Sequence, residues 1–426
     1  MATAHSSRFS LLLFVFILSV SALSYCQAKP SRGGRRAPVN YDIPAPDEKI
    51  FNILDYGVRP NTKNVYQMQI RWAFLAACRA FGRTRVVIPP GRYMVDSLLF
   101  AGPCNSSRLV FQIAGDLVAT TDLSNMGDGY WILFEHIKGL VVIGTRGSLD
   151  GQGGVPMETE NRSIWQANDC KTNDNCVFPP ASLKFHYVNN VIVRNIKSIN
   201  PKAFHFHVNN CRNIRFQKVH LIAPDDSPNT DGIHTSNSSY VKITQSLIQT
   251  GDDCISLGHG SSNIFVSDVT CGPGHGFSIG SLGERQNEFP VMNVFFRRSR
   301  LIRTDNGVRI KTFPKPNKNH VTNVVFDDIM MTDVKNPIII DQEYHTPQAS
   351  TSSHVKLRDI QISNVRGSSI SPVAVKVVCS KLFLCDNLNL SNINLKYTGT
   401  KSGGFTSSCL NAKPVYSGIQ IPPPCK

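Results

Sequence analysis

The sequence predicts an all-β protein, a single-stranded right-handed parallel β-helix with a short N-terminal capping helix. Short runs of alternating apolar residues recur between turn residues, as half-buried strands require. One degenerate phrase, Asn-Val-Ile-Val-Arg-Asn-Ile in its first copy, also returns roughly every 23 to 31 residues, which is the period of a solenoid coil. Its copies begin at Asn190, Asn213, Tyr240, Asn263, Asn293, Asn323 and His354. A sandwich or barrel also has short strands, but neither predicts a phrase that repeats in register.

Residues 1–46 are expected to lie outside the fold. Residues 1–28 contain Arg8 and an apolar run from Leu11 to Leu23, which is shorter than the about 20 residues that span a bilayer, so they predict a secretory signal peptide. Residues 29–46 begin with a basic, glycine-containing segment and predict a flexible arm, with a tether to an acidic matrix as the alternative. Residues 47–426 contain no linker and predict one domain. We therefore expect an exported protein that no membrane segment retains.

One amphipathic helix is predicted near the start of that domain, over residues 67–81. Its apolar side chains recur at helical spacing. They are Ile70, Ala73, Phe74, Ala77 and Cys78. The end of a solenoid must be covered, because an open strand edge would otherwise pair with other chains. We therefore expect this helix to cap the first coil.

The charge balance is strongly basic. Lys and Arg number 45 and Asp and Glu 30, which gives a formal charge of +15 and a pI near 9.3. The chain has no recognisable nucleic-acid-binding motif, so nucleic acid is not expected as a partner. Outside the cell, a basic surface suits an acidic polysaccharide or an anionic membrane face, and charge alone does not choose between them.

Cysteine and asparagine patterns fit an exported protein. Twelve cysteines are present, and an odd number remains after Cys26 leaves with the signal. Disulfides are favoured over zinc ligation, because no pairs have finger-like spacing. Closely spaced candidates are Cys170/Cys176, Cys254/Cys271, Cys379/Cys385 and Cys409/Cys425, but spacing does not decide connectivity. The pairing is left open for Cys78, Cys104, Cys170, Cys176 and Cys211. Glycosylation sequons begin at Asn105, Asn161, Asn237 and Asn389.

Four polar clusters precede or enter strand-like runs at about one-coil spacing. They read Asn229-Thr-Asp231, Gly251-Asp252-Asp253, Gly274-His275-Gly276 and Arg309-Ile-Lys311. In a solenoid, equivalent positions of successive coils lie side by side. The sequence therefore predicts one surface groove that contains three carboxylates, an imidazole and two cations.

Carboxylates paired across a groove suit cleavage of a glycosidic bond, because one can protonate the leaving oxygen while another activates water. Adjacent aspartates also occur in turns and calcium sites, so Asp252 and Asp253 gain meaning only from Asp231 one coil away. His275 would tune the proton affinity of the acid. The cations offer a fork and a point charge for substrate carboxylates. Tyr344 could contact a sugar or serve in packing.

Taken in order, Asn229-Thr-Asp231-Gly, Gly251-Asp-Asp253, Cys271-Gly-Pro-Gly-His275-Gly and Arg309-Ile-Lys311 resemble the four motifs of the plant polygalacturonases, glycoside hydrolase family 28. The resemblance covers nearly the whole chain. It implies metal-free and cofactor-free hydrolysis, with inversion, of the α-1,4 linkages of pectate, an acidic polysaccharide. It makes residues 47–426 a polygalacturonase domain, secreted to the plant cell wall, and we expect a monomer.

The same resemblance implies roles for individual residues. Asp252 is similar to the general acid, Asp231 and Asp253 to the pair that activates water, and His275 to the histidine that supports the acid. The residues similar to the family's substrate-binding set are Asn229, Arg309, Lys311 and Tyr344. The disulfides that the resemblance implies are Cys254/Cys271, Cys379/Cys385 and Cys409/Cys425.

Some features of the sequence depart from that pattern or narrow it. Residues 61–64 replace a Gly-Asp-rich turn, and His345 stands where many relatives have cysteine. Residues 304–312 look most like the pollen-type branch, which slightly favours exo over endo action. Two other functions stay open: a calcium-dependent pectate lyase, and a pectin-binding wall protein that has lost catalysis.

Overall fold

The computed structural model describes residues 41, 43–126, 129–157, 161–167, 178–346, 351–400 and 402–425. The described residues belong to one compact unit, Tyr41–Lys426. The predicted signal peptide, most of the predicted arm, and the candidate pair Cys170/Cys176 lie outside the described residues. Within the described part of the chain, no helix is both long enough and apolar enough to span a membrane.

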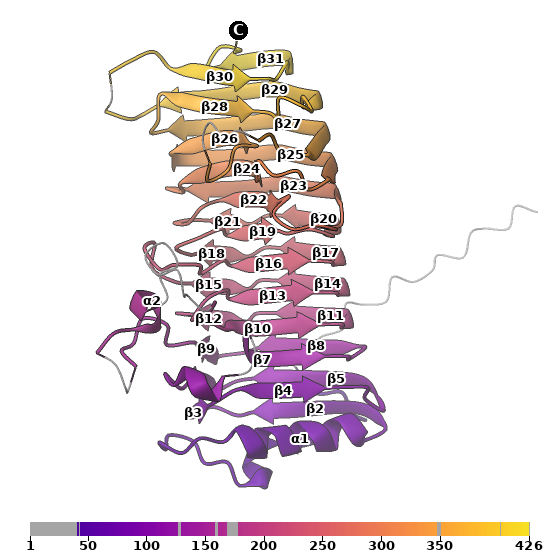
Figure 1. The fold of residues 1–426 in the computed structure, drawn as a ribbon. Helices are drawn as coiled ribbons and strands as arrows, with labels where there is room; N and C mark the ends of the chain where they lie inside the picture. Colours follow the sequence, from indigo (N-terminus) through magenta and orange to yellow (C-terminus); the bar gives the residue numbers. More distant parts are fainter. Residues whose placement is uncertain are drawn as a thin grey trace, which may run out of the picture. The chain divides into compact units, whose positions relative to one another are not determined.

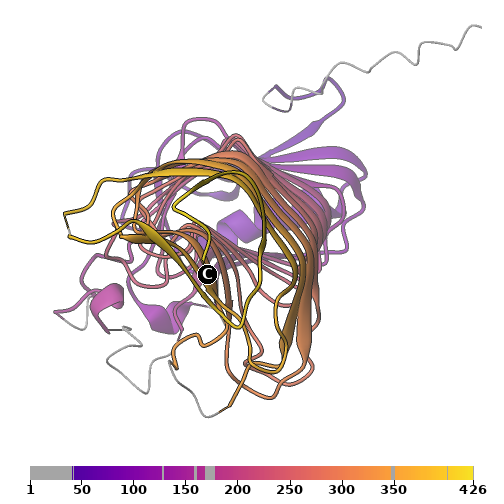
Figure 2. The same cartoon turned by 90° about the horizontal axis from the view of Figure 1, so that it is seen from above.

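The unit 41–426 is a right-handed parallel β-helix, as predicted. Its strands form a 20-stranded sheet and an 11-stranded sheet, and the strands of both sheets pair in parallel with those of the neighbouring coils. Figure 1 shows the strands stacked coil upon coil, and Figure 2, seen along the stack, shows the coils following one another around a common interior.

The element bounds follow the chain order. The larger sheet contains β1 (Lys49–Asn52), β2 (Gly82–Ile88), β3 (Arg92–Val95), β5 (Ser106–Ile113), β6 (Asp116–Ala119), β8 (Leu140–Gly144), β9 (Ser148–Asp150), β11 (Asn189–Arg194), β12 (Lys197–Ile199), β14 (Arg212–Gln217), β15 (His220–Ile222), β17 (Ser239–Thr244), β18 (Leu247–Gln249), β20 (Ser262–Ser267), β21 (Thr270–Cys271), β23 (Val291–Ile302), β25 (Asn319–Val334), β27 (Val355–Ser369), β29 (Asp386–Tyr397) and β31 (Val415–Ile421). The smaller sheet contains β4 (Leu98–Ala101), β7 (Tyr130–Glu135), β10 (Ala181–His186), β13 (Phe206–Asn209), β16 (Ile233–Ser236), β19 (Ile255–Leu257), β22 (Phe277–Leu282), β24 (Asn306–Thr312), β26 (Asn336–Asp341), β28 (Val373–Val378) and β30 (Thr406–Leu410). The helices are η1 (Ile53–Tyr56), α1 (Gln67–Arg79), η2 (Leu123–Asn125) and α2 (Ile164–Ala167).

The repeated phrase marks a turn that the backbone makes once per coil. Its first residue adopts a left-handed conformation in several copies, for example φ 57° at Asn213, 54° at Asn263 and 55° at Asn323. Asparagine tolerates this conformation better than most residues. The amides also bond between coils, and Asn323 Nδ2 donates to Asn293 Oδ1 at 2.8 Å. Asparagine therefore recurs because it satisfies both requirements of the turn.

The prediction that the last copy of the phrase begins at His354 is wrong. The strand register aligns Asn323 with Asp359, which has φ 54°, and not with His354. Strand β27 carries alternating apolar residues on both sides of Asp359, so alternation alone could not fix the register. The turn conformation, and not the apolar pattern, identifies the equivalent position.

The interior of the coils is apolar and closely packed. Phe277, Phe296 and Phe326 stack in successive layers, with ring centroids 5.0 Å apart at both steps. Each of these side chains is buried. Burial of apolar area contributes roughly 25 cal/mol per Å², so the stacked interior supplies the main stabilisation and holds successive strands in register.

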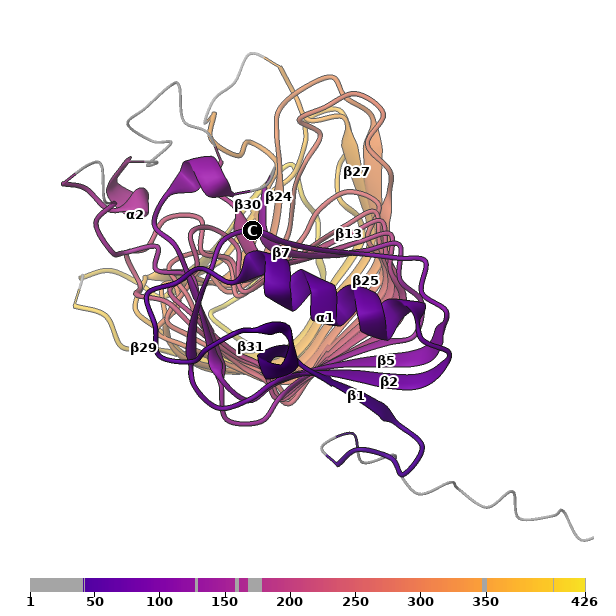
Figure 3. The ribbon, with the colours of Figure 1, turned by 90° about the horizontal axis from the view of Figure 1, so that it is seen from below.

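Helix α1 covers the first coils, as the cap prediction required (Figure 3). Its buried face packs Phe74 against Phe100 of β4, with ring centroids 4.6 Å apart. A disulfide between Cys78 and Cys104 ties the helix to the turn that follows β4. The sequence had left the partner of Cys78 open. The cap is therefore fixed both by packing and by a covalent link.

The remaining disulfides and sequons are distributed along the coils. The structure pairs Cys254 with Cys271, Cys379 with Cys385 and Cys409 with Cys425, the pairs that the resemblance implied. Cys211 is buried as a free thiol. Of the sequon asparagines, Asn105 and Asn161 are exposed, whereas Asn237 and Asn389 are half-buried. Glycosylation at these four positions stays a prediction.

Candidate active site

A groove of about 1520 Å³ crosses the smaller sheet at β16, β19, β22 and β24. Eight of the residues that line it are those that the sequence predicted as catalytic or substrate-binding. They are Asn229, Asp231, Asp252, Asp253, His275, Arg309, Lys311 and Tyr344. The structure therefore brings the whole predicted set to one surface depression.

The strand ladder explains why these residues meet. His234, Ser256, Ser278 and Arg309 occupy equivalent positions in four successive strands, β16, β19, β22 and β24. The carboxylates come from the turns that precede those strands. Backbone bonds between coils fix the turns, since the Gly232 N–H donates to the Asp253 carbonyl oxygen at 2.9 Å. Strand positions and turn positions together form the groove floor.

Asp253 accepts hydrogen bonds from two cations and one hydroxyl. Its Oδ1 accepts from Arg309 Nη2 at 2.6 Å and from Ser278 Oγ at 2.6 Å, and its Oδ2 accepts from Lys311 Nζ at 2.9 Å. Only 1% of its side chain is exposed. Burial would raise the pKa of Asp253, but the charges of Arg309 and Lys311 outweigh burial and hold that pKa below its usual range. The two cations therefore favour the ionised form of Asp253.

Asp231 has the opposite electrostatic setting. Its Oδ2 accepts a hydrogen bond of 2.6 Å from Ser256 Oγ. No described cation pairs directly with its carboxylate. Burial, followed by the neighbouring charges of Asp252 and Asp253, raises the pKa of Asp231 well above its ordinary value. Of the two buried carboxylates, Asp231 is thus the stronger base once it has ionised.

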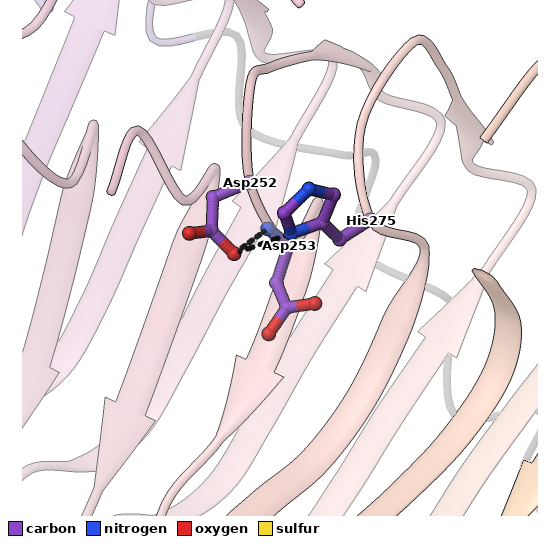
Figure 4. A group of neighbouring side chains, drawn as sticks. All are labelled: Asp252, Asp253 and His275. Atoms are coloured by element: carbon purple, nitrogen blue, oxygen red, sulfur yellow. Dashed lines mark hydrogen bonds and ion pairs between the residues drawn. The ribbon is translucent and has the colours of Figure 1, made fainter. Parts of the chain in front are cut away.

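Asp252 is the more accessible carboxylate, with 24% of its side chain exposed. Its Oδ1 accepts from the Asp253 backbone N–H at 2.7 Å and lies 3.0 Å from His275 Nδ1, as Figure 4 shows. Within the described chain no hydrogen bond reaches its Oδ2. One oxygen is therefore held in place while the other faces the groove.

Two glycines allow His275 to reach that position. Gly274 and Gly276 have φ of 142° and 86°, a region that favours glycine. A Cβ on Gly276 would lie 2.0 Å from the Asn306 carbonyl oxygen. The backbone can thus follow the turn that points the imidazole at Asp252.

Tyr344 stands at the edge of the groove beside the cations. Lys311 Nζ lies 5.2 Å from the centre of its ring. The ring also contacts Phe313 and His345, at centroid distances of 5.6 and 3.9 Å. The ring of Tyr344 therefore packs against neighbouring rings and also lines the groove, and its contact with a sugar stays a prediction. Asn229, with φ 56°, lines the same depression from a turn.

The cluster Asp252, Asp253 and His275 has ligand atoms within 4.8 Å of one another, so its fit to a cation can be tested. Calcium takes six to eight oxygen ligands. Both oxygens of Asp253 already bind the cations Arg309 and Lys311, which would also repel a divalent ion. These residues do not fit the calcium site of the lyase alternative.

Several groove residues were missed by the sequence reasoning. His234 and Ser256 are outward-facing positions of β16 and β19, and the strand alternation could have found them. Ser278, at the equivalent position of β22, is buried and donates to Asp253 below the groove surface. Trp165, in α2, and Phe178 line the groove from the connection between β9 and β10, which does not follow the coil repeat. Alternation therefore finds floor residues but not wall residues.

Three carboxylates in a surface groove of a parallel β-helix define the class of the protein as a glycoside-cleaving solenoid. Residues 78–418 match Glycosyl hydrolases family 28, and the chain belongs to that family.

Similar proteins cover most of the chain. An exopolygalacturonase from Platanus acerifolia is 42% identical over 377 residues, which are 88% of this chain and 97% of that protein. A polygalacturonase from Gossypium hirsutum is 37% identical over 376 residues, 88% of this chain and 89% of that protein. The solved structure of a hyperthermoactive exopolygalacturonase from Thermotoga maritima shares the fold, with a TM-score of 0.71 and 18% identity over 88% of this chain and 91% of that one.

Proposed function

We propose that this protein is a secreted polygalacturonase that hydrolyses the α-1,4 linkages of pectate. The observation that carries the proposal is the juxtaposition of three carboxylates with Arg309 and Lys311 in one groove. The carboxylates provide acid and base chemistry, and the cations suit a polymer that bears a carboxylate on each sugar. Family membership and the names of the similar proteins support the same activity.

In the proposed mechanism Asp252 is the general acid. Its Oδ1 is held by the Asp253 N–H and by His275. The free Oδ2 then carries the proton toward the glycosidic oxygen of the leaving sugar. His275 keeps the carboxyl group in this orientation and stabilises the anion that remains after proton transfer.

Asp231 and Asp253 act together on the attacking water. Asp231 takes the proton, because its proton affinity exceeds that of Asp253. Asp253 accepts a hydrogen bond from the water and keeps its own charge. Both oxygens of Asp253 are bound by cations or a hydroxyl, which leaves it a poor nucleophile toward the sugar carbon. Direct attack by water inverts the configuration at that carbon.

Arg309 and Lys311 serve the substrate as well as Asp253. About a tenth of each cationic side chain is exposed, and both line the groove. Each can therefore bind a galacturonate carboxylate while it stays bonded to Asp253. Asn229 and Tyr344 complete this carboxylate-binding part of the groove.

We further propose exo action, in the extracellular space of a plant cell wall, by a monomer that needs no metal. The exo preference is supported by the printed names of similar proteins, including the exopolygalacturonase of Platanus acerifolia. Export is supported by the signal peptide that residues 1–28 predict, with residues 29–46 as an arm and residues 47–426 as the enzyme domain.

The test compares purified wild-type protein with Asp252→Asn on polygalacturonate. We expect reducing-end release to fall by at least about a hundredfold, the usual contribution of a general acid, without a change in melting temperature. Asp328→Asn is the control, because Asp328 belongs to another adjacent pair of aspartates but lies on β25, away from the groove. Near-normal turnover by folded Asp252→Asn would remove the assignment.

The products of the wild-type reaction separate the alternatives. Chromatography should show monomer alone, and proton magnetic resonance of the first product should show the β-anomer. A ladder of oligomers would replace exo by endo action. Ultraviolet-absorbing unsaturated products that a chelator abolishes would indicate a lyase, and binding without any product would indicate an inactive wall protein.

A further inference from the structure

His234 lies in the groove floor, on β16, one coil before Ser256. Its half-buried ring stacks on Phe204, with centroids 4.8 Å apart and 22° between the planes, and meets His207 edge-on at 5.3 Å. Burial, with Lys311 nearby, lowers the pKa of His234 to about 4. A neutral imidazole has one N–H donor and one acceptor nitrogen, so the direction of its hydrogen bonds matters.

A hydrogen-bond chain fixes which nitrogen carries the hydrogen. His234 Nδ1 lies 2.7 Å from Ser256 Oγ, and Ser256 Oγ donates to Asp231 Oδ2 at 2.6 Å. A serine hydroxyl has a single hydrogen, and in the ionised state in which Asp231 would act as a base, its Oδ2 accepts that hydrogen in a hydrogen bond. Nδ1 must therefore be the protonated nitrogen, and it donates to Ser256. Nε2 is left as an acceptor.

The acceptor nitrogen is open to the groove. Within the described chain, His234 Nε2 makes no hydrogen bond. It is not one of the fully buried polar atoms without a partner, so it keeps some contact with solvent. Gly258 lies beside it and also lines the groove. A Cβ on Gly258 would stand 3.3 Å from Nε2 and 3.4 Å from Cε1. The absence of a side chain at residue 258 thus leaves Nε2 accessible.

We propose that His234 binds a sugar hydroxyl through Nε2 and, through Nδ1 and Ser256, positions the Asp231 carboxylate. This inference rests on the proposed function, since the hydroxyl belongs to a sugar unit of the bound polysaccharide. One imidazole then links substrate binding to the orientation of the base. His234 acts on Asp231 as a positioning residue, because Ser256 lies between them.

The chain also influences the protonation of Asp231. The Ser256 hydrogen bond lowers the pKa of Asp231, against the larger raising effect of burial. Without the Nδ1–H donor, the Ser256 hydroxyl is free to turn away and the pKa of Asp231 rises. The charged groups around Asp231 are Asp252, Asp253 and Lys311. The charged and titratable groups around His234 are Lys311, Asp253, His259 and His207. None of them is changed by the substitutions below.

The experiment separates the two nitrogens with four single variants of the full-length enzyme. His234→Asn keeps an N–H donor near the place of Nδ1 but has no atom at Nε2, and Gly258→Ala covers Nε2 without touching Nδ1. Both should raise KM for polygalacturonate by about threefold to tenfold, the value of one hydrogen bond. In both, the acidic limb of the kcat profile should stay where it is in the wild type.

The other two variants, His234→Gln and Ser256→Ala, interrupt the link from Nδ1 through Ser256 to Asp231. The glutamine reaches the place of Nε2 but lacks the Nδ1 donor, and the alanine removes the intermediate hydroxyl. Both should shift the acidic limb of the kcat profile to higher pH, because Asp231 then ionises less readily. Melting temperatures show which variants fold. If His234→Asn does not fold, the KM of Gly258→Ala alone tests whether Nε2 contacts the substrate.

Wild-type KM in Gly258→Ala and folded His234→Asn would overturn the contact with substrate. An unshifted acidic limb in His234→Gln and Ser256→Ala would overturn the positioning role. A wild-type enzyme that releases no reducing ends would instead disprove the proposed function. The two failures are thus distinguishable.

Discussion

Two buried ion clusters lie in different parts of the unit, and they are built differently. Near the N-terminal end, Arg85 and Glu48 form a pair with 1% and 3% of their side chains exposed. Arg85 also donates to Gln112 Oε1 and to the Tyr41 carbonyl oxygen. In the groove, a single carboxylate, Asp253, binds two cations.

The difference lies in the charge balance. A buried pair with one cation and one anion is complete and offers nothing to a ligand. Two cations on one buried carboxylate leave positive charge available at the groove surface, where a second carboxylate can bind. The N-terminal pair is therefore structural, whereas the groove cluster has the positive charge that the proposed function assigns to substrate binding.

The largest effect is expected from Arg85→Met, which leaves Glu48 buried without its partner. We expect a loss of about 3–5 kcal/mol in unfolding free energy, measured by denaturant titration, with kcat/KM of the folded fraction near that of the wild type. The double variant Glu48→Leu with Arg85→Met should recover most of the loss. If the single variant lost activity while it kept its stability, the contrast between the two clusters would fail.

The next effect is expected from Arg309→Met in the groove. Loss of one partner of a buried charge pair costs about 2 kcal/mol or more, so kcat/KM on polygalacturonate should fall by about 30-fold or more. Lys311 still neutralises Asp253, which limits the effect on folding. Arg309→Lys should give an intermediate loss, because it keeps the charge but not the fork. Equal activity of all three proteins would show that the second cation is not used by substrate.

The smallest expected effect is the loss, at acidic pH, of the stability that Asp253 contributes. Because the pKa of Asp253 is lowered in the folded protein, its contribution to stability is complete above its ordinary pKa near 4 and is lost as pH falls below it. The stability difference between wild type and Asp253→Asn should therefore shrink below pH 4, by at most about 1.4 kcal/mol per pH unit.

The control for the acid titration is Asp268→Asn, which removes an exposed pair with Arg298. Solvent screens that pair, so its contribution should be slight at every pH. A constant difference between wild type and Asp253→Asn down to pH 2 would contradict the ionised state assigned to Asp253.

The sequence could predict the fold and the composition of the groove floor because both depend on spacing. A recurring asparagine turn sets the coil period, and equivalent coil positions then meet. It could not distinguish Asp231 from Asp253, because two aspartates in similar turns differ only through the cations that the fold brings to one of them. The partner of Cys78 and the wall residue Trp165 also depend on connections without periodicity.

The strand ladder of the groove floor has a consequence for substrate shape. Neighbouring parallel strands are about 4.8 Å apart, so equivalent side chains of the floor repeat at that distance, once per coil, along the solenoid axis. Equivalent positions of four consecutive strands are occupied by His234, Ser256, Ser278 and Arg309. A polymer that lies along the axis keeps its groups opposite these side chains only if its repeat length matches the spacing of the strands. A chain with a different rise per sugar would drift out of step within a few units, whatever charge it carried.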